Sequence, residues 1–124
     1  MDRDFRYLIK QHGGMFAKGR LLGIQFEALF TDGLYESLGK HAVDQAQRLR
    51  AGIAALRFPF LTASPTNQIF PIFPKAMLTA IAASFVYSPW CAVDETHEAI
   101  RLCASWATDP AQVDALLELI RRNA

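Results

Sequence analysis

The stretch IRLCASW, residues 100–106, decides the fold class of this 124-residue chain. Its apolar side chains alternate with Arg101, Cys103 and Ser105, and a period of two is typical of a strand that turns one face to a core. Arg101 is therefore expected on the face that points away from the core. The residues predicted to face the core are Ile100, Leu102, Ala104 and Trp106.

Directly after this strand, the sequence predicts a closing helix. Asp109 is suited to accept backbone N–H bonds at its start, and Pro110 fits the first helical position. Arg121 and Arg122 place positive charge in the last turn, where the helix dipole favours it. The predicted apolar stripe of this helix is Val113, Leu116, Leu117 and Ile120.

A longer helix is expected well before the strand. Apolar residues recur at steps of three and four between residues 35 and 56, which is the pattern of an amphipathic helix on a core. The residues Thr31-Asp32-Gly33 break the chain in front of it. Asp44 and Arg48, four residues apart on its polar side, are expected to form a solvated surface pair. The predicted stripe is Tyr35, Leu38, Ala42, Ala46, Leu49, Ile53 and Leu56.

Shorter elements are expected between the long helix and the strand. Residues 68–73 have strand composition, although Pro71 cannot donate to a ladder and favours an edge position or a bulge. Residues 75–83 predict a short helix, and residues 85–87 a short strand that leads into a bend at 88–90. The order of elements predicts the α+β class: a two-layer small domain with helices packed on one face of a small, mainly antiparallel sheet.

The N-terminal part predicts one more helix, residues 15–30, so that a long apolar helix precedes this domain. Its apolar residues fall on nearly all sides, between two narrow polar lines, and such a helix needs packing partners on both sides. We therefore expect the chain to dimerise or aggregate. Residues 1–124 are interpreted as a single domain, because chains usually split into domains only well above this size.

Composition excludes several classes of function. The 13 Lys and Arg residues against 12 Asp and Glu give a net charge of +1, which argues against binding to nucleic acid or to an acidic membrane. Charges precede any apolar stretch at the N-terminus, unlike a signal peptide, and two isolated cysteines fit a reducing compartment. We expect a cytoplasmic protein without a membrane span. The histidines His12, His41 and His97 are scattered, and no metal site is predicted.

Arg101 is the most informative charged residue. A guanidinium in mid-strand on the non-core face has a planar fork that matches a carboxylate with two parallel hydrogen bonds. Three interpretations stay open: a ligand carboxylate, an internal Asp or Glu, or an ordinary exposed arginine.

The pair Gly13-Gly14 is a weaker candidate site. Backbone N–H groups before a helix that carries Lys18 and Arg20 can bind a phosphate, but a plain helix-entry turn explains the same residues. Cys103 has no identifiable histidine and acid partners, so no nucleophile is predicted there.

Several motifs, taken in order, resemble a known enzyme family. They are GGM at 13–15, AKGRLLG at 17–23, IRL at 100–102 and SWAT at 105–108. The chain resembles the C-terminal portion, including the small domain, of the β-eliminating lyase and threonine aldolase family. These are pyridoxal-phosphate (PLP) enzymes of the aspartate aminotransferase fold type I. The resemblance covers nearly the whole chain.

The resemblance implies roles for three residues. Arg101 matches the family's arginine that binds the α-carboxylate of the amino-acid substrate. In the family, the segment after GGM lies near the cofactor phosphate, often that of the neighbouring subunit. Phe16 stands where several relatives carry arginine, so Lys18 and Arg20 are the candidates for contact with that phosphate.

The resemblance also implies what the chain lacks. The family's Schiff-base lysine, the carboxylate at the pyridine nitrogen and the aromatic stacking residue belong to a catalytic large domain upstream of the matching part. Lys10, Lys18, Lys40 and Lys75 lack the context of that lysine. We expect no catalytic residue, no bound PLP and no catalysis from this chain alone. Its expected partners are the missing catalytic half or a second copy of the chain.

Three accounts of the chain are open. In the first, it is the C-terminal portion of a PLP-dependent lyase acting on amino acids, and it contributes Arg101 and part of the dimer interface. In the second, it is a stand-alone, non-enzymatic module derived from that fold, which dimerises or binds small acids. The third is an unrelated α+β domain with chance similarities, which the ordered motifs disfavour. The choice between aldol cleavage and β-elimination also stays open.

Overall fold

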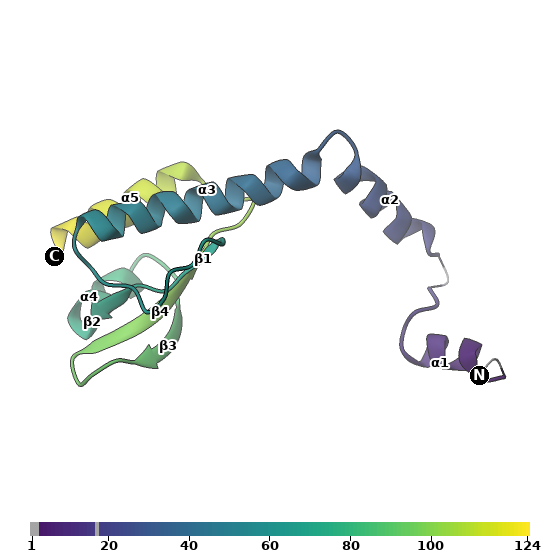
Figure 1. The fold of residues 1–124 in the computed structure, drawn as a ribbon, viewed down its shortest axis with the longest axis horizontal. Coiled ribbons are helices and arrows are strands. Elements are labelled where there is room, and N and C mark those ends of the chain that lie inside the picture. Colours follow the sequence, from purple (N-terminus) through teal and green to yellow (C-terminus); the bar gives the residue numbers. More distant parts are fainter. Residues whose placement is uncertain (1–2, 17) are drawn as a thin grey trace. The chain divides into compact units, whose positions relative to one another are not determined.

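A computed structural model describes residues 3–16 and 18–124 of the chain (Figure 1). The chain divides into two units, Met1–Glu36 and Ser37–Ala124, and each is described by itself. We call them the N-terminal unit and the C-terminal unit. In chain order the elements are α1 Phe5–Gln11, α2 Arg20–Phe30, α3 Leu34–Ala55, β1 Gln68–Ile69, β2 Ile72–Pro74, α4 Lys75–Ala82, β3 Ser88–Ala92, β4 His97–Cys103 and α5 Pro110–Arg122.

The N-terminal unit begins with α1, a helix that the sequence analysis did not predict. Gly13 ends it in the left-handed region at φ 73°. The Gly13 N–H donates to the Lys10 carbonyl and the Gly14 N–H to the Ile9 carbonyl, at 3.1 and 2.8 Å. These two bonds form a Schellman motif, in which glycine avoids the steric cost of positive φ. The pair Gly13-Gly14 is therefore a helix exit, not a helix entry.

The helix predicted over residues 15–30 is shorter in the structure. α2 begins at Arg20, after the N-cap Gly19. Ala17, which the prediction placed in this helix, lies outside the described residues. Neither α1 nor α2 contains a buried residue.

The predicted break before the long helix is confirmed. Asp32 and Gly33 take positive φ values of 53° and 70°, which turn the chain between α2 and α3. The Thr31 hydroxyl donates to the Glu27 carbonyl at 2.6 Å and closes the last turn of α2. The predicted surface pair on α3 is wrong: Asp44 pairs with Lys40, and Arg48 reaches Asp114 on α5.

The C-terminal unit is built on a four-stranded antiparallel sheet with β4 at its centre. Ala99 pairs with Ile72 of β2 and with Cys91 of β3, so these two strands flank β4 on opposite edges. β1 lies on the same edge as β2, where Ile69 pairs with Leu102. This arrangement confirms the predicted α+β class and the antiparallel sheet.

The strand predicted over residues 68–73 is interrupted. β1 and β2 keep one common register against β4, but Phe70 and Pro71 separate them. Pro71 has no N–H to donate, whereas its carbonyl accepts from the Ile100 N–H at 3.1 Å. One proline therefore divides the ladder without shifting its register.

The short strand predicted over residues 85–87 is wrong, because β3 begins at Ser88, opposite Arg101. Pro89 pairs with Ile100 and Cys91 pairs with Ala99, so Trp90 is an extra residue in a β-bulge. β3 has β4 as its only strand neighbour in the described sheet. Such an outer strand tolerates Pro89, which the sequence analysis assigned to a bend.

The core lies between the sheet and the helices, with α3 and α5 side by side over one face (Figure 1). A Cβ at Gly52 of α3 would overlap the Leu117 side chain of α5, so this glycine permits their close approach. Trp106 is 67% exposed and not in the core, because β4 ends at Cys103. The core residues are Ala46, Leu49, Ile53, Ile69, Phe73, Met77, Leu78, Ile81, Ile100, Leu102, Ala104, Val113, Leu116 and Ile120.

Candidate functional site

Arg101 lies in the middle of β4, between two buried core residues. Ile100 and Leu102 are buried against the helices, so the strand alternation turns the Arg101 side chain to the opposite face of the sheet. The prediction that Arg101 points away from the core is therefore confirmed. The side chain is half-buried on that face, with Ser88 of β3 directly opposite.

The guanidinium of Arg101 has two described contacts. Its Nη2 donates to the Ser88 hydroxyl oxygen at 3.2 Å, and its Cζ lies 5.9 Å from the centroid of the Trp90 ring. A cation at this distance from an indole face is attracted by the ring quadrupole. The Nε atom is buried and has no hydrogen-bond partner among the described residues. The guanidinium therefore has an unused donor.

Two aromatic rings cover the sheet next to Arg101. Phe70 and Trp90 meet edge to face, with centroids 4.9 Å apart, although they come from opposite edges of β4. Ala99 projects to the same face as Arg101 and has 0% exposure, so this outer face is partly covered. The Trp90 ring, packed against Phe70, thus gives the guanidinium an apolar surrounding on one side.

The alternative of an internal acid partner finds no support in the structure. Within residues 3–16 and 18–124, no ion pair joins Arg101 to an Asp or Glu. The one hydrogen-bond partner of the half-buried guanidinium among the described residues is a neutral hydroxyl, so no carboxylate of this part of the chain offsets the arginine charge. Such a group is chemically suited to bind a carboxylate from outside this part of the chain.

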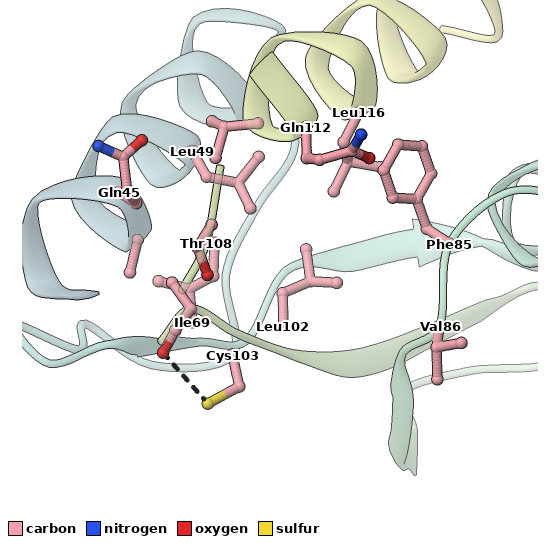
Figure 2. Close-up of a pocket in the computed structure, with 13 residues that line it drawn as sticks. Gln45, Leu49, Ile69, Phe85, Val86, Leu102, Cys103, Thr108, Gln112 and Leu116 are labelled. Atoms are coloured by element: carbon pink, nitrogen blue, oxygen red, sulfur yellow. Dashed lines mark hydrogen bonds between the residues drawn. The ribbon is translucent and has the colours of Figure 1, made fainter. Parts of the chain in front are cut away.

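A pocket of about 150 Å³ lies on the other side of the sheet, between β4, α3 and α5 (Figure 2). Leu49, Ile69, Leu102 and Leu116 give it an apolar lining, and Arg101 is not among its lining residues. The Oε1 atom of Gln45 at this pocket is buried and has no hydrogen-bond partner among the described residues. The pocket and the arginine are therefore separate features.

Lys18 and Arg20, the candidates for a phosphate contact, lie in the N-terminal unit. Both side chains are exposed, Lys18 in a turn and Arg20 at the first position of α2. The Gly13 and Gly14 amides form the helix-ending bonds described above, so these N–H groups are not free for a phosphate. The role of Lys18 and Arg20 stays a prediction.

The lysines of the chain do not fit a covalent PLP site. Lys10, Lys18, Lys40 and Lys75 are all exposed; Lys40 pairs with Asp44, and Lys75 donates to the Glu95 carbonyl at 2.9 Å. A lysine that attacks a carbonyl is normally activated by desolvation or by a neighbouring cation. We derive no reaction step through PLP on this chain.

Two carboxylates have clearly lowered pKa values: Asp94, which is exposed, and Glu118, which is partly exposed. Hydrogen bonds from the Thr96 backbone and hydroxyl, with smaller ones from His97, hold the pKa of Asp94 far below its usual range. Hydrogen bonds from Arg122 and then Arg121 lower the pKa of Glu118. These groups stabilise a turn and a helix end. No group of three or more metal-ligating side chains occurs in the described part of the chain.

Sequence reasoning missed two contacts of Arg101, Ser88 and Trp90, and also missed Phe70, which packs on Trp90. It assigned Ser88 and Trp90 to a bend and Phe70 to a strand without a partner. The pairing register between β3 and β4 brings Ser88 and Trp90 close to Arg101, and a register cannot be predicted from local patterns. The only local signal was the presence of a serine and aromatic residues close to Pro89 and Pro71.

No protein-family model matches the chain, and no curated protein matches it. A solved structure of threonine aldolase from Leishmania major is 36% identical, with a TM-score of 0.91 over 98% of this chain. This chain is a threonine aldolase-like domain. The resemblance to the threonine aldolase family is thereby confirmed, and chance similarity of an unrelated domain is excluded.

The threonine aldolase-like domain spans 36% of the length of the Leishmania major protein. The backbone agreement extends over both units, because 98% of this chain is covered. None of the described helices is long and apolar enough to cross a bilayer.

Proposed function

We propose that this chain contributes the substrate-binding arginine and part of a subunit interface to a PLP-dependent lyase that acts on amino acids. In this proposal Arg101 binds the α-carboxylate of the substrate. The chain alone is inactive, because the cofactor-binding part comes from another region of the enzyme. Lys18 and Arg20 are proposed to approach the cofactor phosphate.

The state of the Arg101 guanidinium carries the proposal. It is half-buried, and among the described residues it has one hydrogen bond, to a neutral hydroxyl, and no ion pair. A carboxylate supplies an acceptor and a negative charge to the guanidinium together, and a charge-assisted pair of this kind is the strongest hydrogen bond available to an arginine. The similarity to a threonine aldolase supports the proposal independently of the contacts of Arg101.

The chemistry divides between the cofactor and the residues of this chain. PLP, when bound by the rest of such an enzyme, supplies an electron sink for bond cleavage at the substrate Cα. Arg101 binds the substrate carboxylate and fixes the orientation of the Cα substituents. Orientation of this kind lowers the barrier because the entropy of alignment is lost on binding and not during the reaction.

The exposed apolar residues of the N-terminal unit support the proposed interface. α2 has no buried residue, although Leu21, Phe26 and Phe30 are each at least 60% exposed. Exposed apolar patches of this kind mark surfaces that bind other protein segments. The proposed occupants are the catalytic part of the enzyme and a second copy of this chain.

A chimera tests the proposal. In it, this chain replaces the matching segment of Leishmania major threonine aldolase, and cleavage of L-threonine is assayed with PLP present. We expect an active chimera, a strongly raised KM after Arg101→Lys, and a KM within about twofold after Arg50→Lys. Arg50 is a matched control because it also lies over an aromatic ring and has a buried Nε. An inactive chimera that is folded, or a KM unaffected by Arg101→Lys, contradicts the proposal.

The proposed inactivity of the chain alone has its own test. PLP is added to the isolated 124-residue chain, followed by borohydride, and the chain is digested and analysed by mass spectrometry. We expect no reduced adduct at one specific lysine, since all four lysines are exposed. A stoichiometric adduct at a single lysine overturns this part of the proposal.

A further inference from the structure

We propose that Trp90 is a positioning residue for Arg101: the β3 bulge places its ring beside the guanidinium and fixes the direction in which the arginine presents its charge. This inference rests on the proposed function, because it concerns the arginine that is proposed to bind the substrate carboxylate. Trp90 is not a catalytic residue in this proposal, since it acts through Arg101.

The bulge is the first observation that carries the inference. In a regular ladder the residue after Pro89 would pair with Ala99, but Cys91 occupies that position and Trp90 is the extra residue. A bulge of this type changes the direction of the side chain that it inserts. Here the inserted side chain comes within 5.9 Å of the guanidinium carbon, measured to the ring centroid.

A second contact fixes the guanidinium from the same strand. Ser88, two residues before Trp90, accepts a hydrogen bond from Nη2 at 3.2 Å. One strand therefore holds the arginine by a hydroxyl and by a ring. Because these contacts are to neutral groups, they restrict the side chain without neutralising the charge that a carboxylate would bind.

Phe70 holds the ring of Trp90 in place. Its edge-to-face contact with Trp90, at 4.9 Å between centroids, crosses from the opposite edge of β4. Trp90 is 53% exposed, so burial against the sheet is not enough to fix the orientation of its ring. An aromatic pair of this geometry favours one orientation of the indole.

The first test measures how strongly the Arg101 side chain is restricted in the isolated 124-residue chain. NMR relaxation gives the order parameter of the Arg101 Nε–H bond, which we expect above about 0.6 in the wild-type chain, as for a restricted group. Trp90→Leu removes the ring, and we expect the order parameter to fall below that value. Trp90→Phe keeps a ring and is expected to preserve most of the order. Backbone order parameters of β4 are expected to stay unchanged.

The second test measures the consequence for substrate binding in the chimera. We expect Trp90→Leu to raise the KM for L-threonine about three- to tenfold with kcat within about twofold, and Trp90→Phe to rescue most of this change. Trp106→Leu is the matched control, because Trp106 is the other tryptophan of the chain and is also exposed. Trp90→Thr, which also suits a strand, replaces Trp90→Leu if that variant does not fold.

The outcomes separate this inference from the proposed function. If Arg101→Lys raises KM while the ring-removing Trp90 variant changes neither KM nor the Arg101 order parameter, the positioning role is wrong and the proposed function stands. If Arg101→Lys leaves KM unchanged, the proposed function fails, and this inference fails with it. A KM that rises equally for Trp90→Phe and Trp90→Leu also overturns the role of the ring.

Discussion

The helices α2 and α5 have similar apolar content, but only α5 has buried residues. Seven of the eleven residues in RLLGIQFEALF and seven of the thirteen in PAQVDALLELIRR are apolar. α2, in the N-terminal unit, buries none of them, whereas α5, in the C-terminal unit, buries Val113, Leu116 and Ile120. The difference lies in what surrounds each helix.

A core needs partners as well as apolar residues. α5 presents one stripe, and the sheet, α3 and α4 contribute the residues that cover it. α2 is apolar on nearly all sides, and the other complete helix in the described part of its unit, α1, is also without buried residues. The N-terminal unit therefore has the composition of an interface and not of a domain with its own core.

The largest expected effect is on association. We expect the full chain to dimerise or aggregate, and a shortened chain of residues 34–124 to be monomeric, because the shortening removes the exposed apolar residues of α1 and α2. Light scattering at matched concentrations measures both. A full chain that remains monomeric would contradict the claim that the N-terminal unit is an interface.

The next effect is on stability. Phe73 has 0% exposure and packs edge to face on Phe58, so Phe73→Ala is expected to lower the free energy of unfolding by about 3–5 kcal/mol. Phe26→Ala in α2 removes the same side chain from a site that is 62% exposed, and we expect a change within about 0.5 kcal/mol. Urea titration of both variants measures this difference, and equal losses would contradict it.

A smaller effect is expected at the start of α5. The Asp109 carboxylate accepts from the Ala111 N–H at 2.9 Å, and Asp109→Ala should cost about 1 kcal/mol of stability. Asp109→Asn is the control, since asparagine also accepts this bond, and it should change stability much less. Thermal melts of both variants measure the cap, and identical melts would show that it contributes nothing.

The smallest effect is a dependence on acid pH. The pKa values of Asp94 and Glu118 are lower in the folded chain than in the unfolded chain, so their contribution is present above about pH 4 and is lost as the pH falls through the folded pKa values. Asp94→Asn should reduce this loss of stability at acid pH, because asparagine does not titrate. Amide exchange of the Thr96 N–H, which donates to Asp94 at 2.7 Å, measures it between about pH 2 and pH 6. Exchange that is independent of pH after correction for intrinsic rates would contradict the expectation.

Local signals in the sequence predicted most of the C-terminal unit. The middle of the predicted stripe on α3, from Ala42 to Ile53, the cap of α5 and the alternation along β4 each depend on residues a few positions apart, and the structure confirms them. The start of the stripe was wrong, because Tyr35 is 55% exposed. The end of β4 and the start of β3 were wrong because ladder ends depend on partner strands. The Arg48–Asp114 pair was missed for the same reason, since its partners lie on two helices.

The candidate site was predictable in part. The alternation of IRLCASW placed Arg101 on the outer face, and the resemblance to the threonine aldolase family suggested its ligand. The surroundings of the arginine depend on a bulge and on a pairing register, neither of which local patterns encode. Trp90 and Ser88 therefore entered the site only with the structure.

The most direct test of the central claim compares two ligands that differ only at the carboxylate. Apparent affinities of the chimera for L-threonine and for L-threonine amide are measured before and after Arg101→Ala. If Arg101 binds the carboxylate, the affinity for L-threonine falls by about 2–4 kcal/mol and the affinity for the amide changes little. An equal fall for both ligands, or no fall for L-threonine, contradicts the claim.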